Sequence, residues 1–118
     1  MRNHIFIAVA IALALAACEK KAAEVPVAVP KVDIISPVDG AKLSVKANNK
    51  VEYNITLGGE GDHAHIYIDD RRIGMLRRTQ GSFDIDYLEP GKREICIKIV
   101  NSNHTPIGVG RCVTITAE

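Results

Sequence analysis

Apolar and polar residues alternate along most of the chain beyond residue 50. In the first run, Val51, Tyr53 and Ile55 alternate with polar neighbours, the period of two expected of a strand with one face in a core. Similar runs follow, separated by short segments rich in Gly, Pro, Asn and Asp that are typical of turns. The expected strands cover residues 32–36 with a continuation near 42–46, 50–57, 63–69, 72–77, 81–88, 92–100 and 108–116.

About seven short strands with a turn roughly every ten residues predict an all-β fold, a single antiparallel sandwich. Three segments add a resemblance. ISPVDGA at 35–41 and YLEPGK at 87–92 resemble segments of bacterial Ig-like domains, and AHIYIDD at 64–70 is similar to a strand and turn of uncharacterised periplasmic Ig-like domains. The resemblance covers about residues 32–117 and implies an Ig-like β-sandwich. In that topology the strands at 63–69, 92–100 and 108–116 share a sheet, and the loops before 63 and after 100 emerge at one end. The chain has no tryptophan, so it is not of the antibody subtype.

The N-terminal segment predicts a location. An apolar run from residue 5 to 17 is followed directly by Cys18. The segment Leu15-Ala16-Ala17-Cys18 resembles the lipobox of bacterial lipoproteins, which implies that Cys18 is lipidated and becomes the N-terminus of the mature protein. The alternative is an uncleaved membrane helix, but the run is shorter than the roughly 20 apolar residues that span a bilayer. We therefore expect a signal peptide at 1–17, a lipidated cysteine and flexible tether at 18–31, and one domain at 32–118. By family analogy Glu19 implies the periplasmic face of the outer membrane, the inner membrane being the alternative.

The charge balance and the lack of catalytic motifs argue against two classes of function, nucleic-acid binding and catalysis. Removing residues 1–17 takes away Arg2 and no acidic residue, so basic and acidic side chains become equal in number. Such a neutral chain lacks the basic excess of nucleic-acid-binding proteins. No arrangement of serine, histidine and carboxylate residues matches a catalytic motif. The sequence therefore predicts a non-enzymatic binding or accessory module, held to the membrane by lipid, with an envelope protein or the cell wall as partner.

Two cysteines remain once Cys18 carries lipid. Pairing Ile95 with Val113, core residue opposite core residue, places Cys96 opposite Cys112 and predicts a disulfide in an oxidising compartment. The alternative is a reduced pair that binds metal or does redox work, but the spacing is not C-x-x-C. The same register places Arg111 on the core face, which requires a bulge near residues 108–110 or an edge position.

Three histidines form the one candidate site. His63 and His65 begin a strand two residues apart and share a face, and His104 lies in the loop expected at the same end. Converging imidazoles could bind copper or zinc, with Asp62, Asn103 or water completing the shell. The alternative function is therefore a periplasmic Cu/Zn-binding protein. The competing interpretation is that these are ordinary surface histidines.

The hairpin around residue 70 offers two further candidates. Met75 would suit copper, but strand parity predicts that Ile73 and Met75 face the core, unless a bulge at Gly74 reverses the parity. Four arginines make this hairpin basic, as expected of an edge strand protected against pairing, or of contact with anionic lipid or cell-wall polymer. They are Arg71, Arg72, Arg77 and Arg78.

Overall fold

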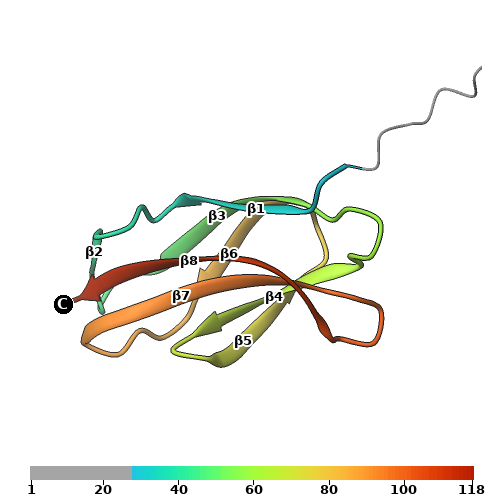
Figure 1. Cartoon of the computed structure of the whole chain (residues 1–118). Helices are drawn as coiled ribbons and strands as arrows, with labels where there is room; N and C mark the ends of the chain where they lie inside the picture. Colours follow the sequence, from blue (N-terminus) through green and yellow to red (C-terminus); the bar gives the residue numbers. More distant parts are fainter. Residues whose placement is uncertain (1–27) are drawn as a thin grey trace, which may run out of the picture.

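The computed structural model describes residues 28–118, and these contain no apolar helix of membrane-spanning length. The expected signal peptide, Cys18 and most of the tether lie outside the described residues. Eight strands make up the described part (Figure 1). They are β1 (Lys31–Ser36), β2 (Lys42–Leu43), β3 (Asn49–Thr56), β4 (His63–Ile68), β5 (Arg71–Leu76), β6 (Gln80–Ile85), β7 (Gly91–Val100) and β8 (Pro106–Ala117).

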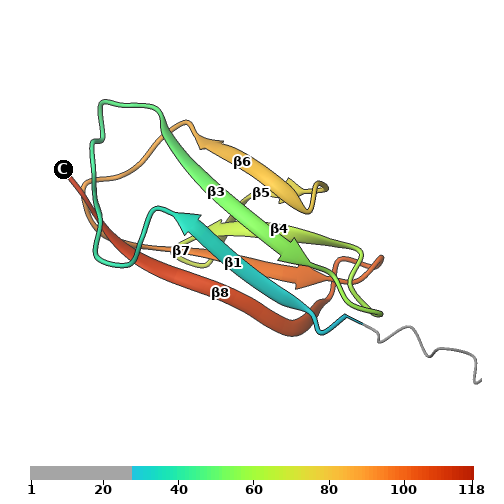
Figure 2. The ribbon, with the colours of Figure 1, turned by 90° about the horizontal axis from the view of Figure 1, so that it is seen from above.

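The strands form two sheets packed face to face, so the predicted Ig-like β-sandwich is confirmed (Figure 2). One sheet has the order β1-β3-β6 and the other β2-β8-β7-β4-β5. The predicted strands at 63–69, 92–100 and 108–116 do share a sheet, as β4, β7 and β8. The expectation of a wholly antiparallel fold is wrong at one place, because β2 pairs in parallel with the end of β8. The continuation expected near 42–46 is this two-residue strand, which joins the sheet opposite to that of β1.

The core lies between the sheets and is built mainly from β-branched side chains. In β3, Val51, Tyr53 and Ile55 are all at most 4% exposed, and they alternate with residues on the outer face. The opposite sheet contributes isoleucines with no exposed surface, at positions 66, 95, 97, 99 and 115. Branched residues suit strands because they fill the pleated surface with few rotamers. The period of two in the sequence is therefore the alternation between core and exterior.

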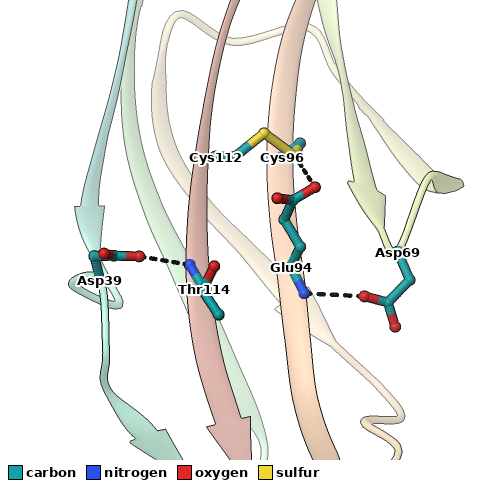
Figure 3. Close-up of a disulfide and its surroundings, with 6 residues drawn as sticks. All are labelled: Asp39, Asp69, Glu94, Cys96, Cys112 and Thr114. Carbon is teal, nitrogen blue, oxygen red and sulfur yellow. Dashed lines mark hydrogen bonds between the residues drawn. A yellow bond between two sulfur atoms is a disulfide. The ribbon is translucent and has the colours of Figure 1, made fainter.

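The pairing of β7 with β8 has the predicted register. Ile95 lies opposite Val113, and Cys96 lies opposite Cys112, to which it is joined by a disulfide (Figure 3). A carboxylate oxygen of Glu94 lies 3.4 Å from the Cys96 sulfur. Both sulfurs are therefore oxidised in this structure, in contrast to the alternative of a reduced pair that binds metal.

Arg111 lies opposite Ile97 as the register requires, but its side chain is exposed. Two features make this possible. Pairing with β2 is confined to residues 116–117, so β8 is an edge strand at Arg111. Residues 107–109 also form a bulge, since Lys98 pairs with Gly110 but Val100 pairs with Pro106. An edge strand next to a bulge can turn a side chain away from the core.

The hairpin of β4 and β5 turns tightly through Asp69 and Asp70, whose φ angles are 47° and 65°. Two positive φ angles in a two-residue loop match the twist of the flanking strands. One carboxylate oxygen of Asp69 accepts a hydrogen bond from the Glu94 backbone at 3.0 Å (Figure 3), and the other pairs with Arg93 at 3.0 Å. The Glu94 hydrogen bond, and then Arg93, lower the pKa of Asp69. The turn is thereby fastened to β7.

The expected inward orientation of Met75 is wrong. Ile66 pairs with Gly74, but the next pair joins Tyr67 to Arg72, so Ile73 is an extra residue in β5. The bulge reverses the parity of the rest of the strand, leaving Met75 43% exposed. Gly74 takes the inward position because the Phe83 ring packs there: a Cβ on Gly74 would lie 2.5 Å from a ring carbon.

We expect replacement of both cysteines by alanine to lower the free energy of unfolding by about 3 kcal/mol. The disulfide joins residues 16 apart in sequence and restricts the unfolded chain accordingly. Urea denaturation measures the loss, and reductant added to the unaltered protein should produce a similar one. Both thiols should resist alkylation until reductant is present. Free alkylation of both in the untreated protein would contradict the assignment.

Candidate metal centre

His63 and His65 project from the outer face of the five-stranded sheet. They alternate along β4 with Ala64 and Ile66, both of which are fully buried in the core. An outward position would ordinarily expose an imidazole, yet His63 is 3% and His65 2% exposed. Two histidines are thus enclosed on the outside of the sandwich.

The third histidine comes from the loop between β7 and β8. This loop is held in shape by Asn101, whose side-chain oxygen accepts hydrogen bonds from the backbone of Asn103 at 2.9 Å and Thr105 at 3.0 Å. The backbone N–H of His104 donates to the Asn101 carbonyl at 3.0 Å. His104 has a φ of 62°, a left-handed conformation that is uncommon for a residue with a side chain. Such strain persists only where the surrounding structure enforces it.

The predicted convergence of the three histidines is what the structure contains. Nε2 of His63 lies 3.1 Å from Nε2 of His65 and 3.1 Å from Nδ1 of His104, and the last two atoms are 3.2 Å apart. These nitrogens form a nearly equilateral triangle. For zinc–nitrogen bonds of about 2.0–2.1 Å, two ligands of a tetrahedral ion are separated by about 3.3–3.4 Å. The triangle is thus close to one face of a tetrahedral coordination shell, and an ion bonded to all three atoms would keep a fourth position open.

Two of the rings also have hydrogen-bond partners outside the triangle. Nδ1 of His63 lies 2.7 Å from a carboxylate oxygen of Asp62, which as an ionised group can only accept. In the neutral tautomer that donates Nδ1–H to Asp62, Nε2 of His63 has a lone pair that faces the triangle. Nδ1 of His65 lies 3.3 Å from the hydroxyl oxygen of Tyr67, which can accept in the same way. Carboxylate or hydroxyl partners of this kind orient the histidine ligands of metal sites.

These contacts change the expected role of Asp62. The sequence suggested it as a fourth metal ligand, but its carboxylate binds the far side of the His63 ring. Asn103 as a ligand stays a prediction. Among the histidine, cysteine and acidic side chains of residues 28–118, only His63, His65 and His104 gather at this point. Glu94, Cys96 and Cys112 form a second group, but its two sulfurs are bonded to each other.

Burial and neighbouring charges favour the neutral form of His65. Burial lowers the pKa of its imidazole, and the charges of His63, Arg72 and His104 lower it further. A neutral imidazole retains the lone pair that a metal ion needs.

Two supporting residues, Tyr67 and Asn101, were not identified from the sequence. Tyr67 has the same parity as His63 and His65 along β4, so the pattern H-x-H-x-Y could have placed it on the same face. Asn101 lies at a turn position where its side chain commonly bonds to the following backbone. Neither the parity of Tyr67 nor the turn position of Asn101 would have shown which histidine each residue contacts.

Comparisons with known proteins bear on the fold. No protein-family model matches the chain, and no curated protein sequence does. Among solved structures it is similar to fibronectin(III)-like modules of CbhA from Clostridium thermocellum, with a TM-score of 0.62 and 14% sequence identity over 74% of this chain and 95% of that one. It is also similar to an engineered protein from a structural genomics consortium, with a TM-score of 0.54 and 15% identity over 77% of this chain and 20% of that one. These likenesses assign the chain to the fold of the fibronectin III-like β-sandwiches.

Proposed function

We propose that this protein is a lipid-anchored, non-enzymatic β-sandwich module of the bacterial envelope, and that it binds one copper or zinc ion through His63, His65 and His104. The observation that carries the metal proposal is the triangle of imidazole nitrogens, with edges of 3.1, 3.1 and 3.2 Å. Each nitrogen belongs to an imidazole, a type of ligand that both copper and zinc bind.

The surroundings of the triangle favour a built site over a chance cluster. A surface histidine is normally hydrated, whereas His63 and His65 are almost fully enclosed. Asp62 and Tyr67 hold the outer ring nitrogens of His63 and His65, and a bound ion would be the common partner of the nitrogens that face one another. The loop of Asn101 holds His104 in a strained conformation that turns its ring toward the other two. These features describe a preformed site on a rigid sheet.

The open fourth position suits an accessory role. Structural zinc sites are usually closed by four protein ligands, whereas three ligands leave room for water or for a group from a partner. His104 is itself exposed, so the ion would be accessible from one side. A module of this kind could hold an ion and exchange it with an envelope protein.

The anchoring part of the proposal depends on the N-terminal sequence. Leu15-Ala16-Ala17-Cys18 resembles a lipobox, and a lipidated Cys18 followed by Glu19 would place the domain on the periplasmic face of the outer membrane. Disulfides persist in that compartment, so the bond between Cys96 and Cys112 is compatible with it.

The metal proposal predicts one equivalent of bound Cu(II) or Zn(II), measured by calorimetry on the detergent-solubilised chain. His104→Asn should weaken binding more than about 100-fold, beyond the range typical of outer-shell changes. Asparagine tolerates the left-handed backbone of this position, so the loop should keep its shape. Ser102→Ala, at an exposed position of the same loop, is the control. Equal affinities of the His104→Asn and unaltered proteins, or no binding tighter than about 10 μM, a free energy of about 7 kcal/mol, would refute the proposal.

Asp62 should act by orienting His63. Asp62→Ala is expected to reduce metal affinity about 10- to 100-fold, while Asp62→Asn, which keeps an acceptor oxygen, should recover most of the loss. Glu60→Ala, an exposed carboxylate in the same loop, should have no effect. Competition with a chromophoric chelator measures all three variants. A loss in Asp62→Asn as large as in Asp62→Ala would instead indicate direct coordination by the carboxylate.

Cys18→Ala should give an unlipidated protein that retains its signal peptide, because lipoprotein processing acts on the modified cysteine. Labelling with radioactive fatty acid and intact mass measure the two effects. The double variant Cys96→Ala/Cys112→Ala is the matched control, and it should still be labelled. Label in Cys18→Ala at the level of the unaltered protein would reject the lipobox assignment.

A further inference from the structure

Met75 lies next to one of the three triangle residues. In the pairing of β4 with β5 it is directly opposite His65, so both side chains project from the same face of the sheet. Directly opposed residues have Cβ atoms about 4.5–5.5 Å apart. At 43% exposure, Met75 is one of the few large apolar side chains left open to solvent among residues 28–118. The bulge at Ile73 is what places a thioether here.

The other neighbour of His65 is already engaged. On the opposite side His65 pairs with Lys98, whose ammonium nitrogen lies 5.0 Å from the centre of the Tyr67 ring. Met75 has a flexible, unbranched side chain, so its sulfur can be directed along the face of the sheet. It is therefore the cross-strand neighbour of His65 that carries a soft ligand atom.

The charge around the triangle favours a singly charged ion. Arg72 and Lys98 both lie near His65, and the three imidazoles contribute no negative charge. Asp62 is the anion in contact with the cluster, through the far side of His63. Adding a divalent ion to this environment is less favourable than adding a monovalent one, because Coulomb repulsion from the neighbouring cations scales with the charge of the ion.

We propose that the metal is copper and that Met75 provides a thioether ligand to its Cu(I) form. The inference rests on the proposed function, since it requires the three histidines to bind metal. Imidazole accepts copper and zinc alike, whereas a thioether selects Cu(I). Cys96 and Cys112 are joined in a disulfide, so they offer no thiolate. A thioether supplies a soft sulfur ligand that disulfide formation cannot remove.

The test compares two metals in two proteins. Cu(I) affinity is measured by competition with bicinchoninate under nitrogen, and Zn(II) affinity with a chromophoric chelator, on the full chain in detergent. Met75→Leu, which removes the sulfur at similar volume, should lower Cu(I) affinity at least about tenfold. Zn(II) affinity should stay within about twofold, because protein zinc sites use imidazole, thiolate and carboxylate ligands and not thioether. Thiol titration before and after checks that the disulfide stays intact.

A relocated thioether and a spectroscopic signature complete the test. Ile35, 57% exposed on β1 of the other sheet, can be changed to methionine in the Met75→Leu background, and this should not restore Cu(I) affinity. In selenomethionine-labelled protein, selenium absorption should show a copper neighbour that is lost in Met75→Leu. Unchanged Cu(I) affinity in Met75→Leu, or equal losses for both metals, would overturn the role of Met75 and leave the metal site standing. Failure of the unaltered protein to bind Cu(I), Cu(II) or Zn(II) would overturn the proposed function itself.

Discussion

The pairing of β7 with β8 is the constraint on which the other features depend. Its register places Ile95 against Val113 in the core and brings Cys96 and Cys112 together on the outer face. Because the register is fixed, the connection from residue 101 to 105 has a fixed length and emerges beside the start of β4. His104 can therefore reach the two histidines of that strand. A slip of one residue would exchange the core and outer faces of the hairpin. It would separate the two cysteines and move His104 away from the histidines of β4.

Much of the fold and of the site follows from alternation in the sequence. The two-residue period identified the strands, and the condition that core residues face core residues gave the register that joins Cys96 to Cys112. The same parity placed His63 and His65 on one face, and the expected topology added His104. The first two inferences succeeded because each depends on local spacing or on one hairpin, whereas the position of His104 came from the Ig-like topology, which places β4 beside β7. None of them required the side-chain packing between the two sheets.

The expectations that failed depend on contacts between distant segments. The inward orientation of Met75 failed because the Phe83 ring, from the other sheet, packs against Gly74 and the extra residue Ile73 shifts the parity. The parallel pairing of β2 depends on where the chain crosses between sheets. Asp62, one of three groups expected to complete the metal shell, instead contacts the far side of the His63 ring, and spacing in the sequence does not reveal such ring contacts. In each case side-chain packing or hydrogen bonding decided the outcome.

The first described residues determine which end of the sandwich is attached to the N-terminal segment. Pro30 lies against Gly58, and residues 28–30 line a surface hollow with residues 59, 60, 107 and 109. This is the end at which β3 leads into β4 and β7 into β8, where the histidines gather (Figures 1 and 2). From Cys18 to Ala28 a chain can extend at most about 35 Å. With the proposed lipid at Cys18, a bound ion would therefore lie within a few nanometres of the bilayer, at the end of the domain nearest the membrane. Partners embedded in that membrane could reach the ion, whereas the hairpin of Asp69 would extend into the open periplasm.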